Sequence, residues 1–188
     1  MKDRYEAVKA LFPLIPKTWF GWLDVGCGDG RLFREVAPDC RMIGMEKDPN
    51  LVARVPFRCE AVEHDFNKPW PFATEEFDLV TAISVIQYAD NIEHIFKEAS
   101  RVLKPDRTFI VEFPNFDFMG GFIRPSMFVM DDRIRSEFGI KDVIQTGRDW
   151  GFKEYGPFPV GRFQLLKAMF PKTLAANVIV KFQSESVK

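Results

Sequence analysis

The stretch Trp22-Leu23-Asp24-Val25-Gly26-Cys27-Gly28-Asp29-Gly30 decides how the rest of the chain is organised. An apolar, strand-like run over residues 19–23 leads into it, and a helix-like run over residues 31–36 follows it. Glycines at alternate positions allow a sharp turn and a close approach of the backbone to a ligand, because no Cβ intervenes. The following helix presents unpaired N–H groups and the positive end of its dipole. This order of elements predicts a nucleotide-type site at the carboxyl end of a parallel sheet.

The residues around the glycines limit the kind of nucleotide. A dinucleotide fingerprint would need a third glycine where Arg31 or Phe33 stands, and the Lys-Ser/Thr ending of a P-loop is absent. Asp24 lies two residues before Gly26, where its carboxylate would repel a bound phosphate and attract an ammonium or sulfonium group. A glycine-rich turn without a ligand is the alternative interpretation.

A second acidic residue strengthens the prediction of a ligand. Residues 41–46 have the pattern of a strand that ends at Glu46, about 20 residues beyond Asp24. A carboxylate in this place can accept hydrogen bonds from both hydroxyls of a ribose. We expect Lys47 to lie near the adenine edge, and a solvated strand end is the alternative for Glu46.

Two further strands bring more residues to the same edge. Residues 57–63 predict a strand that leads to Asp65, which can accept from an adenine amino group, and to Phe66, which can flank the ring. The apolar run 77–83 predicts a central strand buried on both faces, and we expect its end, Ala82-Ile83-Ser84, to pass beside the cofactor.

The next helix is predicted to begin at Asp90 with Glu93 as a capping box. Its charged face includes His94 and Glu98, so we expect both to be solvated and do not assign His94 as a catalytic base.

These residues together resemble the class I S-adenosylmethionine-dependent methyltransferases, and the stretch 77–113 resembles their type 11 group. Asp106-Arg107 and Gln87-Tyr88 depart from the usual pattern, in a turn and near the acceptor side respectively. The resemblance implies an α/β, doubly wound, mostly parallel seven-stranded sheet with an antiparallel last strand. It implies S-adenosylmethionine as the cofactor. The cofactor-binding residues that we predict are Asp24, Gly26, Cys27, Gly28, Gly30, Glu46, Lys47, Asp65, Phe66 and Ala82.

Length and composition bound the remaining possibilities. A chain of 188 residues suits one domain over 1–188, with the N-terminal helix and cofactor half in 1–113 and the acceptor side and closing strands in 114–188. The net charge of −1 gives no strong nucleic-acid signal, and no apolar stretch is long enough for a membrane span. Three cysteines without a CxxC pair indicate neither a disulfide framework nor a metal site, and predict a reducing cytoplasmic location.

Five other segments complete the interpretation of the sequence. Residues 2–12 have the spacing of a helix, which either packs on the sheet or covers the cofactor, and residues 163–170 predict a short helix. Residues 114–130 follow no clear period, and acceptor binding, core filling and a dimer contact remain open for them. Strands over 152–155 and 177–182 are expected to close the sheet.

The predicted function is methyl transfer from S-adenosylmethionine to a small or medium-sized acceptor molecule. Alignment of the acceptor with the sulfonium supplies most of the catalysis, and the sequence identifies no catalytic base. One alternative is a non-catalytic S-adenosylmethionine-binding regulatory module, and another is a nicotinamide-dependent oxidoreductase, which Arg31 disfavours.

Overall fold

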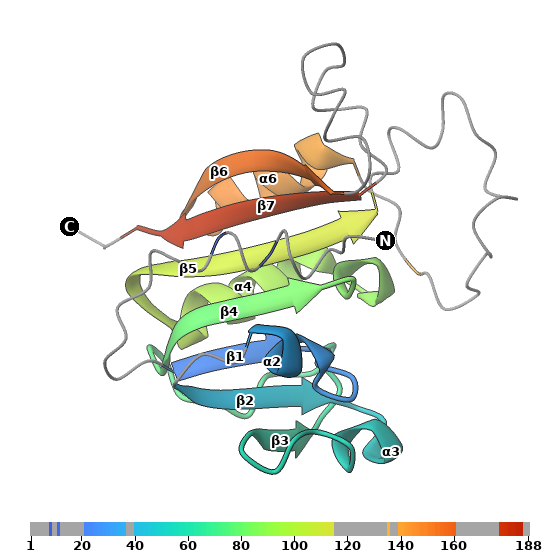
Figure 1. Ribbon diagram of the computed structural model, residues 1–188. Helices are drawn as coiled ribbons and strands as arrows, with labels where there is room; N and C mark the ends of the chain where they lie inside the picture. Colours follow the sequence, from blue (N-terminus) through green and yellow to red (C-terminus); the bar gives the residue numbers. More distant parts are fainter. Residues whose placement is uncertain are drawn as a thin grey trace, which may run out of the picture.

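The computed structural model describes residues 8, 11, 21–36, 40–114, 135, 139–160 and 177–185. The described residues form a seven-stranded sheet in the order β3-β2-β1-β4-β5-β7-β6 (Figure 1). Its strands are β1 (Gly21–Val25), β2 (Arg41–Glu46), β3 (Glu60–Glu63), β4 (Phe77–Ile83), β5 (Leu103–Pro114), β6 (Phe152–Val160) and β7 (Asn177–Ser184). The helices are α2 (Arg31–Val36), α3 (Pro49–Val52), α4 (Ile92–Val102) and α6 (Ile140–Asp149), with a 3-10 turn η1 (Ile86–Tyr88).

Strand order places the glycine loop at a point where the topology changes direction. β1 pairs in parallel with β2 on one side and with β4 on the other, while β7 runs antiparallel to both β5 and β6. From β1 the chain proceeds outward to β2 and β3, then returns to β4 on the opposite side. Ligands of such sheets bind outside the carboxyl ends of the strands at this switch point. The predicted doubly wound sheet with an antiparallel last strand is confirmed.

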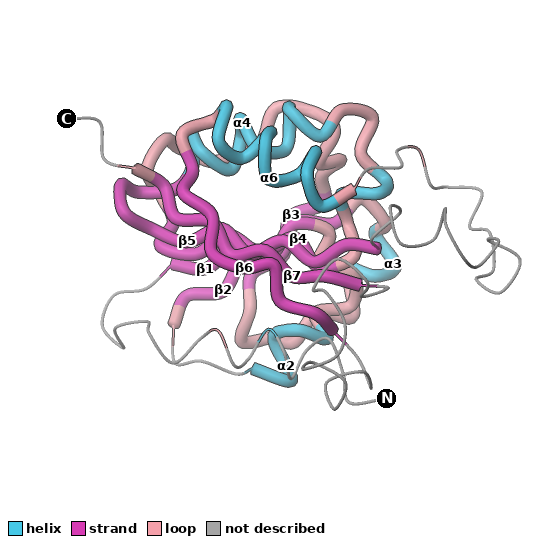
Figure 2. The backbone as a smooth tube through the Cα atoms, turned by 90° about the horizontal axis from the view of Figure 1, so that it is seen from above, coloured by secondary structure: helices cyan, strands magenta, loops and turns pink. Residues whose placement is uncertain are grey.

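The sheet has a hydrophobic layer on each face, with α4 and α6 on one side and α2 on the other (Figure 2). Three phenylalanines from different elements meet under α4, and the ring of Phe96 lies 5.2 Å from the rings of both Phe109 and Phe182. On the α2 side, Trp22 packs edge-on against Phe33 with ring centroids 4.9 Å apart. This double cover explains why the central strand β4 is almost continuously buried.

Several sequence predictions agree with the observed elements. The bounds of β2 and β4 are those predicted, and β6 and β7 begin where predicted but are longer.

Other predictions of local structure are wrong. α4 is capped by Asn91, whose side chain accepts from the N–H of Glu93, so the cap is one residue later than Asp90. β3 begins at Glu60 rather than residue 57, because residues 57–59 form a turn before it. Glu98, expected on a solvated face, is buried because the loop 64–72 returns over it.

Some predictions fall outside the described residues. Of the predicted helix 2–12 only Val8 and Leu11 are described; Val8 is helical and fully buried among the core residues on the α2 side. The rest of that helix, the predicted helix 163–170 and the segment 115–130 lie outside the described part.

Candidate cofactor site

The glycine loop leaves β1 in a tightly hydrogen-bonded turn. The N–H groups of Gly26 and Cys27 both donate to the carbonyl oxygen of Met45 in β2, at 2.7 and 3.2 Å. The N–H of Gly30 donates back to the carbonyl oxygen of Cys27 at 3.0 Å, just before α2 begins. Gly26, Gly28 and Gly30 have φ angles of 64°, 57° and 75°, a region that side chains with a Cβ adopt only at a cost of about 1–2 kcal/mol.

The space beside each glycine shows whether neighbouring side chains require that glycine or whether a ligand could approach it. A Cβ on Gly26 would lie 2.6 Å from Cγ2 of Val85, and a Cβ on Gly30 would lie 2.7 Å from Cδ of Pro56. These two glycines are therefore required by packing as well as by conformation. A Cβ on Gly28 would meet nothing within 4 Å. Gly28 is thus the glycine beside which a ligand has room to approach the backbone.

Glu46 lies directly against this open glycine. Its Oε2 accepts from the N–H of Gly28 at 3.2 Å, and its Oε1 accepts from the N–H groups of Lys47 and Asp48 at 2.9 and 3.1 Å. These bonds fix the carboxylate across the carboxyl ends of β1 and β2. The two carboxylate oxygens have about four acceptor positions, of which these bonds take three, so Oε2 of Glu46 retains capacity for a ribose hydroxyl.

Asp24 lies deeper, at the end of a chain of hydrogen bonds on β1 and β4. Oδ1 of Asp24 accepts from the hydroxyl of Thr81 at 2.6 Å, and the same hydroxyl oxygen accepts from the indole N–H of Trp22 at 2.9 Å. Burial raises the pKa of Asp24 to about 7, an effect that the charge of Glu46 reinforces and the hydrogen bond from Thr81 opposes. A cationic ligand nearby would restore the charged carboxylate, so the site suits a sulfonium or ammonium group.

Cys27 and Ala82 contribute close packing under the loop. The Cys27 side chain is only 7% exposed, and burial together with the charges of Asp24 and Glu46 raises the pKa of its thiol. A thiol of this kind is a small apolar group rather than a nucleophile. Ala82 is fully buried in β4, where it pairs with Val25 of β1.

Asp65 and Phe66 follow β3 at the same end of the sheet. Oδ1 of Asp65 accepts from the backbone N–H and the side-chain amide of Asn67, at 3.0 and 3.1 Å. The backbone bond from Asn67 is the main reason that the pKa of Asp65 lies below its usual range, and the charge of the exposed Lys47 adds to it. Phe66 is 8% exposed and packs with the core on the α4 side.

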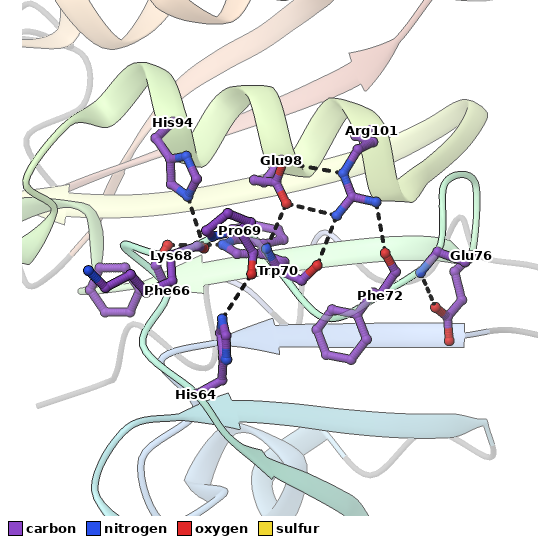
Figure 3. A network of polar contacts seen from close by, with 11 residues as sticks. His64, Phe66, Lys68, Pro69, Trp70, Phe72, Glu76, His94, Glu98 and Arg101 are labelled. Carbon is purple, nitrogen blue, oxygen red and sulfur yellow. Dashed lines mark hydrogen bonds and ion pairs between the residues drawn. The ribbon is translucent and has the colours of Figure 1, made fainter.

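A polar network anchors the loop that carries Asp65 and Phe66 to α4 (Figure 3). The N–H of Trp70 donates to Oε2 of Glu98 at 2.8 Å, and the indole of Trp70 donates to the carbonyl oxygen of Phe66 at 3.0 Å. Arg101 donates to Glu98 and to the carbonyl oxygens of Trp70 and Phe72.

The charge of Glu98 is stabilised by this network. Burial alone would raise the pKa of Glu98, but the bonds from Arg101 and Trp70 outweigh it and hold that pKa below its usual range. Both histidines of the chain have structural contacts: His64 with the carbonyl oxygen of Pro69 and His94 with that of Lys68. His94 is therefore half-buried against the loop, rather than on a fully solvated face.

The structure adds detail at Ser84, in the strand end that the sequence placed beside the cofactor, and adds Glu112, which the sequence did not single out. Ser84 follows β4 with a φ of 57°, and its N–H and hydroxyl both donate to Glu112 of β5, to the carbonyl oxygen at 2.9 Å and to Oε2 at 2.6 Å. Glu112 is fully buried. A left-handed conformation at a non-glycine residue is a known feature of functional sites, but only the coordinates reveal it.

Comparisons with known proteins agree with this fold. Residues 23–111 match the family model described as a methyltransferase domain. Residues 23–111, just under half of the chain, are thus similar in sequence to a methyltransferase domain, and the sheet has the fold of solved S-adenosylmethionine-dependent methyltransferases. A solved S-adenosylmethionine-dependent methyltransferase from Mesorhizobium loti superposes with a TM-score of 0.73 at 14% identity, over 93% of this chain and 95% of the other.

Similarity to a curated protein extends over part of the chain. A sterol 4-C-methyltransferase of Caenorhabditis elegans is 36% identical in an alignment 101 residues long, which covers 47% of this chain and 29% of that protein. The chain thus spans less than a third of the length of that relative. The same fold occurs in the [4+2]-cyclase SpnF, with a TM-score of 0.75 and 17% identity over 98% of this chain and 81% of the other. None of the described helices has the length and apolarity needed to cross a membrane.

Proposed function

We propose that the chain binds S-adenosylmethionine at the glycine loop and transfers its methyl group to a small or medium-sized acceptor molecule. The observation that carries this proposal is the Glu46 carboxylate held against Gly28, the one glycine of the loop with open space beside its Cα. Glu46 would accept from a ribose hydroxyl through Oε2, while Asp65 and Lys47 would lie along the adenine and Asp24 near the cationic end. Members of the matched family use S-adenosylmethionine as methyl donor, which supports the same assignment.

The cofactor supplies an activated methyl group, so the residues of the chain chiefly hold and orient the cofactor and the acceptor molecule. The loop N–H groups, Gly28 and Glu46 would fix the nucleoside, and the carboxylate of Asp24 would favour the positive charge near it. Holding the acceptor in line with the methyl group converts a bimolecular reaction into an effectively unimolecular one. This chemistry requires a base only where the acceptor must lose a proton.

The acceptor is less defined than the cofactor. The C. elegans relative is a sterol methyltransferase, but this chain spans less than a third of that protein, and SpnF is a cyclase with the same fold. Fold alone therefore does not fix the acceptor. We retain a small-molecule acceptor, a reducing cytoplasmic compartment and a homodimer as predictions from the sequence.

A non-catalytic S-adenosylmethionine-binding regulatory module is the second candidate. The feature in its favour is Gln87-Tyr88, which follows the carboxyl end of β4 and departs from the pattern usual in the family that the sequence resembles. Cofactor binding without formation of S-adenosylhomocysteine across a panel of metabolites would favour the module over the enzyme.

Calorimetry with S-adenosylhomocysteine tests the cofactor assignment. We expect wild-type protein to bind it, Glu46→Ala to bind about 10- to 100-fold more weakly, and NADH not to bind. Glu63→Ala is the matched control, because Glu63 pairs with Glu46 in the neighbouring strand and is exposed. Equal affinity of the Glu46→Ala and wild-type proteins would remove Glu46 from the site.

A further inference from the structure

Gln87 differs from the other buried polar side chains that the structure describes. It is 3% exposed, and its Oε1 is buried without a hydrogen-bond partner in the described part of the molecule. The other buried polar side chains all take part in hydrogen bonds; they are Asp24, Asp78, Thr81, Glu98, Glu112 and Ser184. An unpaired buried acceptor lowers stability by about 1–3 kcal/mol, so such groups in native proteins require an explanation.

The backbone around Gln87 is firmly fixed, so the unpaired oxygen does not result from a loose turn. In η1 the N–H of Tyr88 donates to the carbonyl oxygen of Val85 at 2.9 Å, and the carbonyl oxygen of Gln87 accepts from the N–H of Arg135 at 2.9 Å. The preceding residue Ser84 is bonded twice to Glu112. Gln87 is therefore held in place by its main chain while its side-chain oxygen has no partner.

Gln87 also lies close to the candidate cofactor site. Val85, two residues earlier, is the side chain that a Cβ on Gly26 would meet at 2.6 Å, so η1 begins against the glycine loop. η1 follows the carboxyl end of β4, the strand that pairs with β1 at the switch point of the sheet. A molecule that reacts with the cofactor must approach this same edge.

We propose that Gln87 binds the methyl acceptor by accepting a hydrogen bond from an O–H or N–H group of that molecule. This inference rests on the proposed function. An amide oxygen accepts hydrogen bonds and does not take up protons near neutral pH, so Gln87 is a binding and orienting residue, not a base. The acceptor class is therefore limited to alcohols, phenols, amines and amides, and an acceptor without a hydrogen-bond donor would leave the buried oxygen unpaired.

The stability of the protein without acceptor gives the first test. Gln87→Met keeps the length of the side chain and removes the unpaired oxygen, so we expect its melting temperature to rise by about 2–10 °C. Gln183→Met is the matched control, because Gln183 accepts from the hydroxyl of Tyr155 at 3.2 Å and donates to the carbonyl oxygen of Asp106 at 3.5 Å. We expect no rise for this control. A lower melting temperature for Gln87→Met would mean that Oε1 already has a structural partner, and would overturn the proposal.

Binding of matched probes gives the second test. With S-adenosylhomocysteine present, the protein is titrated with phenol and anisole, and with aniline and N,N-dimethylaniline, and followed by NMR. We expect wild-type protein to prefer the member with the donor at least about fivefold, and Gln87→Met to lose this preference while binding S-adenosylhomocysteine normally. An equal preference in both proteins would refute the role of Gln87. Failure of wild-type protein to bind S-adenosylhomocysteine would instead refute the proposed function.

Discussion

Replacing Asp24 with asparagine should stabilise the cofactor-free protein while weakening its affinity for the cofactor. Asparagine preserves the size of the side chain and can still accept from the hydroxyl of Thr81, but it carries no charge. In the wild-type protein the pKa of Asp24 rises from 3.8 to about 7, mainly through burial. The native state therefore holds a proton that the unfolded state releases between these two pH values. Stability falls as the pH rises through this window and remains lower above it.

The magnitude follows from the size of the window. One pKa unit corresponds to about 1.4 kcal/mol, so ionisation of Asp24 lowers the free energy of unfolding by about 2 kcal/mol at pH 5.5 and about 4 kcal/mol at pH 8.5. Asparagine removes this pH-dependent loss. The stability of Asp24→Asn relative to wild type should therefore increase by about 2 kcal/mol between pH 5.5 and 8.5.

Urea denaturation of both proteins without cofactor, at pH 5.5 and 8.5, measures this difference. Asp78 supplies a control of opposite sign at the other end of the sheet. Burial alone would raise its pKa, but hydrogen bonds from Lys104, Arg107 and a backbone N–H hold that pKa below its usual range. Its stabilising effect is present above the unfolded pKa and is lost as the pH falls, so Asp78→Asn should destabilise the protein at both pH values.

Two outcomes would refute the reasoning about Asp24. A difference between Asp24→Asn and wild type that does not change with pH would show that Asp24 does not titrate in this window. A variant that binds S-adenosylhomocysteine and S-adenosylmethionine as tightly as wild type would show that the carboxylate does not contribute to the cofactor site.

Three further predictions concern Glu46, the glycine loop and the network around Glu98. Glu46→Ala should reduce the affinity for S-adenosylmethionine by about 10- to 100-fold without changing the melting temperature by more than a few degrees, as calorimetry and thermal denaturation will test. Gly26→Ala should lower stability more than Gly28→Ala. Both variants lose about 1–2 kcal/mol because of the left-handed backbone, and only Gly26→Ala adds a clash with Val85. Equal losses of stability in urea denaturation would contradict this prediction. Glu98→Gln should lower stability by about 1.5–3 kcal/mol and reduce hydrogen-exchange protection at the N–H of Trp70, and unchanged protection would show that the loop does not depend on α4.

Local pattern determined much of the fold. β2 and β4 were predicted to the residue because their apolar runs are bounded by charged or polar residues at both ends. The cap of α4 was misplaced by one residue because Asp90 and Asn91 are both good capping residues, and sequence cannot say which has the extended conformation. The burial of Glu98 was missed because it depends on a loop that returns from 28 residues earlier in the chain.

Some features of the candidate site could likewise be predicted from local sequence, and others could not. The glycines, Asp24 and Glu46 carry a spacing that sequence reveals, and the structure places Glu46 against Gly28. The unpaired oxygen of Gln87 and the left-handed backbone of Ser84 depend on packing between elements distant in sequence, so no local sequence pattern predicts them. The sequence did mark Gln87-Tyr88 as unusual, without giving the pair a role.

The bond between Trp22 and Thr81 has a practical consequence. Trp22 is fully buried, and its indole N–H reaches the hydroxyl that also bonds Asp24. A change in the ionisation of Asp24 therefore alters the surroundings of the Trp22 indole, which is two hydrogen bonds away. The indole signal of Trp22, in fluorescence or in a nitrogen-15 spectrum, offers a label-free reporter of occupancy that needs no added dye and no knowledge of the second substrate.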